Sequence, residues 1–86
     1  MPELSRFYGI IIRMFYGDHP PPHFHAVYQG EEIQVNINTL EVIEGDMSRR
    51  AQAPVLEWAA LHRTELQQAW GLASRNHEPS KIPPLE

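Results

Sequence analysis

Three histidines lie close together in the segment 18–26 (DHPPPHFHA). His23 and His25 are two residues apart, and such residues point to the same face of a β-strand, so both imidazoles can reach one metal ion. A third ligand would come from the preceding connector, as either His19 or Asp18. The spacing therefore allows a site for a divalent metal such as zinc, with His19, His23 and His25 as candidate ligands.

The same residues allow two other interpretations. In the first, one histidine accepts a proton and the other donates one while Arg13 stabilises a phosphate, which would be the chemistry of a histidine-based RNase or phosphodiesterase with catalytic His23, His25 and Arg13. In the second, the histidines make only structural hydrogen bonds. The number of candidate ligands favours this interpretation, because a closed zinc site normally has four ligands and only three are in view. The structural interpretation is favoured, so no cofactor is expected, and a divalent metal such as zinc is the alternative.

Alternating and β-branched residues predict the strands that position these side chains. The Gln29–Gly30 pair is typical of a two-residue hairpin turn between two of them. The pattern predicts three strands and a short fourth, at residues 9–16, 23–28, 31–38 and 41–44.

A helix is expected after the strands, with Ser48 as its N-cap and an apolar stripe that continues to about residue 73. Pro54 would lie in its first turn or kink it. The fold class is therefore α+β: a three- to four-stranded, mostly antiparallel sheet with a C-terminal helix packed on one face. We expect a single domain over residues 1–75 and a flexible C-terminal tail over residues 76–86, where three prolines and few apolar residues lie.

The hairpin also predicts which residues share a face of the sheet. A two-residue turn places Phe24 opposite Val35 and His25 opposite Gln34, so apolar residues meet under the helix and polar residues meet on the other side. We expect this second face to be uncovered and to form a binding surface. Besides the histidines, its predicted members are Ile11, Phe15, Gln34 and Asn36.

Charge and composition narrow the classes of partner. The chain carries seven lysines and arginines against eleven acids, and five of those acids lie between residues 31 and 46 without a base. This balance does not indicate nucleic-acid binding, although Arg49 and Arg50 at a helix start keep a DNA-binding regulator as an alternative. No apolar run is long enough to cross a membrane and no signal-peptide pattern opens the chain, so a cytoplasmic location is expected.

The chain has only 86 residues and no cysteine, so no disulfide or thiolate site is available to it. Cores of this size usually need a covalent staple, a metal or a partner chain. We therefore expect a partner protein or a homodimer. The sequence favours a small cytoplasmic protein-interaction module over the enzyme and DNA-binding alternatives.

Three segments, 2–32, 40–51 and 56–70, resemble the bacterial family called domain of unknown function 4160. The resemblance covers residues 2–75, and its most specific parts are the segment 18–26 and the E-W-A-x-L-H motif, residues 57–62.

Two positions of this chain depart from the family pattern. Leu40 stands where a glycine is common, and Pro54 enters the helix start. The resemblance implies small cytoplasmic proteins that are often encoded beside another small domain, a context similar to toxin–antitoxin pairs. It implies no catalytic residues.

Overall fold

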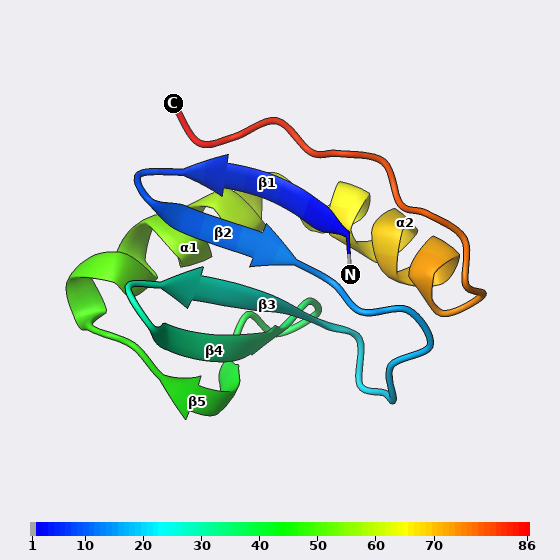
Figure 1. Cartoon of the computed structure of the whole chain (residues 1–86), viewed down its shortest axis with the longest axis horizontal. Helices are drawn as coiled ribbons and strands as arrows, with labels where there is room; N and C mark the ends of the chain where they lie inside the picture. The colour runs from blue at the N-terminus through cyan, green and yellow to red at the C-terminus, as the bar shows by residue number, and fades with distance from the viewer. Residues whose placement is uncertain (1) are drawn as a thin grey trace.

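The computed structural model describes residues 2–86, and within them five strands form one antiparallel sheet whose spatial order follows the chain (Figure 1). The strands are β1 (Glu3–Phe7), β2 (Ile10–Arg13), β3 (His23–Tyr28), β4 (Glu31–Asn36) and β5 (Val42–Asp46). Two helices follow, α1 (Arg49–Leu61) and α2 (Arg63–Ala73). The α+β class is confirmed, but the prediction of three to four strands is wrong because β1 was missed.

Strand β1 lacks the alternating pattern by which strands are recognised. A bulge lies between Glu3 and Ser5, so Leu4 and Phe7 both reach the core although they are three residues apart. A bulge changes which face the following side chains occupy, and the period of two is therefore lost in the sequence. Tyr8, at φ 52°, and Gly9, at φ 78°, form the turn into β2.

The predicted β3–β4 hairpin is confirmed in its register. Phe24 is opposite Val35 and His25 is opposite Gln34. Gln29 and Gly30 both have positive φ, at 48° and 82°, which matches the right-handed twist of the two strands.

The two faces of β3 are also as predicted. Phe24 is fully buried and its ring packs edge-on against Trp58 of α1. His23 and His25 therefore point away from α1, because successive side chains of a strand alternate between faces.

The predicted single helix is two helices. Ser48 is the N-cap of α1 and its side chain accepts a hydrogen bond from the Ala51 N–H. Pro54 lies inside α1 without ending it, and the break falls at His62, whose φ of −122° is not helical. No helix of residues 2–86 is long and apolar enough to cross a membrane.

The helices lie on one side of the sheet, behind it in Figure 1, and α2 reaches the connector between β2 and β3. The Gly17 N–H in that connector donates to the carbonyl of Ala73, the last residue of α2. This contact holds the connector against α2. The peptide bond between Pro20 and Pro21, further along the same connector, is cis.

Residues 76–86, the segment expected to be a flexible tail, run along the outer edge of β1 (red in Figure 1). Ile82 is only 5% exposed and its N–H donates to the Leu4 carbonyl at 2.8 Å. The indole N–H of Trp58 donates to the Pro83 carbonyl, also at 2.8 Å. These contacts cover one edge of the sheet and leave β5 as the other.

The backbone at Leu40 accounts for the glycine that the family resemblance implies at this position. Its φ is 63°, in the left-handed region that favours glycine. The backbone there closes the turn between β4 and β5, where the Leu40 N–H donates to the Asn36 carbonyl at 2.8 Å. The chain thus keeps a glycine-like turn with a leucine in it.

Candidate functional site

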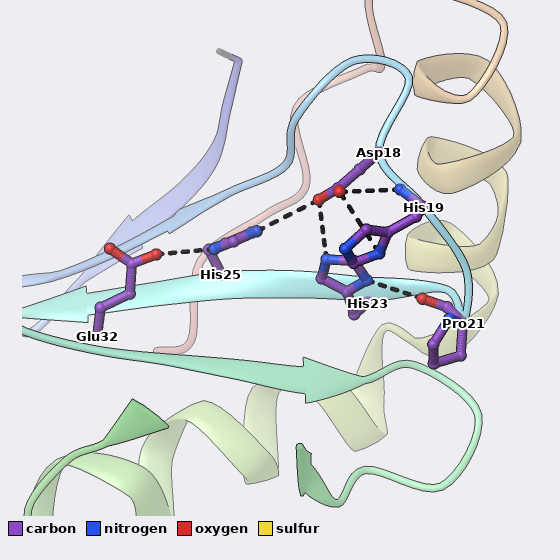
Figure 2. Close-up of polar contacts among 6 residues, drawn as sticks. All are labelled: Asp18, His19, Pro21, His23, His25 and Glu32. Carbon is purple, nitrogen blue, oxygen red and sulfur yellow. Dashed lines mark hydrogen bonds and ion pairs between the residues drawn. The ribbon is translucent and has the colours of Figure 1, made fainter. Parts of the chain in front are cut away.

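The connector between β2 and β3 folds back over the histidine face of the sheet and brings Asp18 to His23 and His25 (Figure 2). The prediction that this face is uncovered is wrong at the two histidines, which are 1% and 5% exposed. The ring of Phe15 meets that of His25 edge-on at 4.3 Å, and Trp70 of α2 lies 5.2 Å from the ring of His23. Connector and α2 together bury the pair.

His23 is held at both of its nitrogens. Its Nδ1 lies 2.7 Å from the carbonyl oxygen of Pro21, and because a carbonyl only accepts, Nδ1 carries a proton and donates it. Its Nε2 lies 2.9 Å from Oδ2 of Asp18. A neutral ring would point a lone pair at this carboxylate. A cation or a shared proton between the two atoms would stabilise this arrangement.

His25 repeats the arrangement with a different acceptor. Its Nδ1 donates to Oε2 of Glu32 at 2.8 Å, and its Nε2 is turned toward Asp18. The distance from Nε2 to Oδ2 of Asp18 is 3.6 Å, too long for a hydrogen bond. This nitrogen is buried and has no hydrogen-bond partner among the described residues.

Asp18 is the carboxylate that both rings face. Burial raises its pKa, but the His19 N–H that donates to Oδ1 at 2.9 Å, the nearby charge of His23 and contacts with both buried rings outweigh that effect. The net result is a pKa below the ordinary value for aspartate. Asp18 is therefore ionised at neutral pH. It carries the negative charge at the centre of the histidine cluster, which consists of Asp18, His23 and His25.

The ligand atoms that converge come from Asp18, His23 and His25, which all lie within 4.8 Å of one another. His19, the third ligand favoured from sequence, lies beside this group and is 81% exposed on its side chain. Its ring centre is 5.9 Å from that of His23. Of the two third ligands considered, the structure places Asp18 at the centre and His19 at the rim.

Glu32 was not among the predicted site residues. The register pairs it with Val27, so it lies diagonally across from His25 on the same face. Long side chains reach across this diagonal in an antiparallel pair. The predicted register already placed Glu32 on this face, so the sequence held the signal. What it did not show is that the Glu32 side chain reaches His25.

Arg13 lies directly opposite His25 in the β2–β3 pair, so the two residues share a face. The predicted surface residues are half-buried and flank the cluster; they are Ile11, Phe15, Gln34 and Asn36. The amide oxygen of Asn36 accepts hydrogen bonds from the N–H groups of Asn38 and Thr39. This side-chain oxygen therefore helps to close the turn after β4.

Comparison with protein families supplies the classification. The model of the domain of unknown function DUF4160 matches residues 9–71, more than half of the chain. The chain belongs to this family. The matched region of the DUF4160 domain runs from the first turn into α2, and it includes the whole histidine cluster.

No curated protein and no solved structure matches the chain. The family description of the DUF4160 domain assigns no activity.

Proposed function

We propose that this DUF4160 domain is a small protein-interaction module that binds an extended, basic segment of a partner protein along β5. The observation that carries the proposal is the bare edge of the sheet at β5. All five of its residues are exposed, and two of them, Val42 and Ile43, are large and apolar.

The two edges of the sheet differ. At β1 the tail covers the edge, and the Ile82 N–H is bonded to Leu4. At β5, in the part of the chain that the structure describes, no backbone hydrogen bond joins the outer side to another segment. An open edge presents unpaired N–H and C=O groups, to which an extended peptide can add as a further strand.

Charge determines which partner fits this edge. Asp46 is directly opposite Glu32 and Glu44 is opposite Gln34, so acidic side chains collect on one face of the β4–β5 pair. Like charges opposite each other are destabilising, and lysines or arginines on an added strand would relieve this repulsion. Pairing β5 with a second copy would instead bring more acids together, which favours a partner protein over a homodimer.

Such a module would form one half of a two-protein pair, in agreement with the toxin–antitoxin-like context that the family resemblance implies. A metal-free RNase has less support. Both nitrogens of His23 face protein acceptors, and the one free nitrogen of His25 is buried. Neither ring offers an accessible nitrogen to a bulky phosphodiester.

The test uses short synthetic peptides of alternating valine and lysine, with valine–glutamate peptides as the matched probe. NMR spectra of the backbone amides should show the lysine peptide shifting β5 and leaving β1 unchanged. The Ile43→Lys variant should bind about tenfold more weakly, equivalent to about 1.4 kcal/mol. The Leu61→Lys variant, changed at an exposed apolar residue at the end of α1, should bind as the parent does.

Two results would overturn the proposal. One is a failure of the expected contact: the lysine peptide leaves the β5 amides unshifted, or it binds the Ile43→Lys variant as tightly as it binds the parent. The other is a stable dimer in light scattering that Ile43→Lys dissociates, because β5 would then serve a second copy.

A further inference from the structure

We infer that Asp18, His23 and His25 form a binding site for a divalent transition-metal ion of the zinc class. Oδ2 of Asp18 and Nε2 of each histidine are the ligand atoms. The inference does not depend on the strand-edge proposal, because its three ligands lie in the β2–β3 connector and on β3, away from β5. Glu32 contributes to both arguments, through its pairing with Asp46 and its hydrogen bond to His25.

The first argument is the orientation of the rings. Metal-binding histidines usually donate their second ring N–H to a carbonyl or a carboxylate, which fixes the tautomer and aims the other nitrogen at the ion. Here Pro21 supplies the carbonyl for His23 and Glu32 supplies the carboxylate for His25. Both Nε2 atoms are thereby turned toward Asp18, as Figure 2 shows.

The second argument is that protons alone leave one atom unsatisfied. A second proton on His23 would complete its hydrogen bond to Asp18 at 2.9 Å. The same proton does nothing for His25, whose buried Nε2 remains 3.6 Å from the carboxylate without a hydrogen bond. Leaving a buried polar atom unpaired is unfavourable. One metal ion between the three ligand atoms satisfies all of them at once.

The third argument is the type of ligand. Two imidazoles and one carboxylate suit zinc and its neighbours, whereas calcium and magnesium prefer sites made of oxygen alone. Metal–ligand bonds of about 2.0–2.1 Å place tetrahedral ligand atoms about 3.4 Å apart. The observed separations from Oδ2 of Asp18, 2.9 Å to His23 and 3.6 Å to His25, lie on either side of this value.

Three protein ligands leave at least one position of the ion open. The exposed His19 lies beside Asp18, with its Nδ1 3.8 Å from Oδ1 of that residue. A water molecule or the His19 ring would complete the coordination. A site of this kind stabilises a small domain without a disulfide, because an ion that binds only the folded state adds its binding free energy to folding.

The test is calorimetric titration of Zn²⁺ and of Co²⁺ into chelator-treated protein that was purified without a histidine tag. We expect one ion per chain, a rise in melting temperature and a change in Trp70 fluorescence, because that indole lies against His23. Asp18→Asn and His25→Asn should each lower the affinity by more than 100-fold. Glu32→Gln, which leaves all three ligands in place, should lower it by about 10–100-fold.

His77→Gln is the matched control, since it removes an exposed histidine beyond the end of α2 and should leave the titration unchanged. Near-UV circular dichroism checks the fold of each variant. If a variant at a buried ligand unfolds, Glu32→Gln still tests the site, because Glu32 is half-exposed and its replacement should leave the fold intact. The inference is wrong if the parent binds no ion, if Glu32→Gln and Asp18→Asn bind like the parent, or if His77→Gln abolishes binding. Retained binding in Ile43→Lys separates this site from the β5 edge.

Discussion

The tail offers the sharpest test of how this small domain is stabilised. The Ile82 side chain is almost completely buried against the core, although it belongs to a segment without regular secondary structure. Changing Ile82 to alanine removes three carbon atoms from this contact. At about 0.8 kcal/mol per buried methylene, the loss is about 2 kcal/mol of unfolding free energy.

This loss converts into a measurable melting shift. With an unfolding entropy of about 2.1 cal/mol/K per residue, the chain of 86 residues changes entropy by about 0.18 kcal/mol/K, so Ile82→Ala should lower the melting temperature by about 11 °C. Urea unfolding followed by far-UV circular dichroism should give the same free-energy difference. Lys81→Ala, at the exposed neighbouring position, should stay within about 0.5 kcal/mol of the parent.

An Ile82→Ala protein as stable as Lys81→Ala would refute this reasoning. It would mean that residues 76–86 are the flexible tail expected from their composition. The edge of β1 would then be open as well, and β5 would lose its distinction as the free edge of the sheet. The stability measurement therefore also bears on the proposed partner site.

Two further predictions concern backbone geometry and charge. Gly45→Ala should weaken the β4–β5 pair and lower the stability by more than about 1 kcal/mol, because φ is 88° and a Cβ would lie 2.2 Å from the Glu32 carbonyl oxygen. Gly71→Ala in α2, where a Cβ meets no atom within 4 Å, should instead raise the stability by about 0.5–1 kcal/mol. Thermal melts of both variants decide this, and equal effects would contradict it. The Arg6 hydrogen bond lowers the pKa of Glu3, so Arg6→Ala should raise that pKa toward its ordinary value in an NMR titration; an unchanged pKa would contradict the pairing. Since the folded pKa is the lower one, the stability from this pair is present above about pH 4.5 and is lost as the pH falls through the folded pKa.

Local patterns in the sequence were sufficient for the centre of the fold. The alternation in β3 and β4 and the Gln29–Gly30 turn predicted the register, and with it the face that His23 and His25 share. Ser48 likewise marked the start of α1. Each of these features depends on residues that are close along the chain, where side-chain period and turn chemistry act directly.

Three other features required the tertiary structure. The bulge in β1 hides its alternation, and the tail joins β1 through contacts across almost the whole chain, which no local pattern reports. A binding surface was expected on an open face, and the fold instead covers the two histidines with its own connector.

The histidine cluster shows most clearly where the sequence alone reaches its limit. The spacing of His23 and His25 determined that two imidazoles share one face. Only the fold decided that Asp18, and not His19, reaches both of them, and that Glu32 orients His25. The physical reason is that the prolines restrict the local backbone but do not determine where the connector folds. Its contacts with α2 and with the two histidines place Asp18 between them.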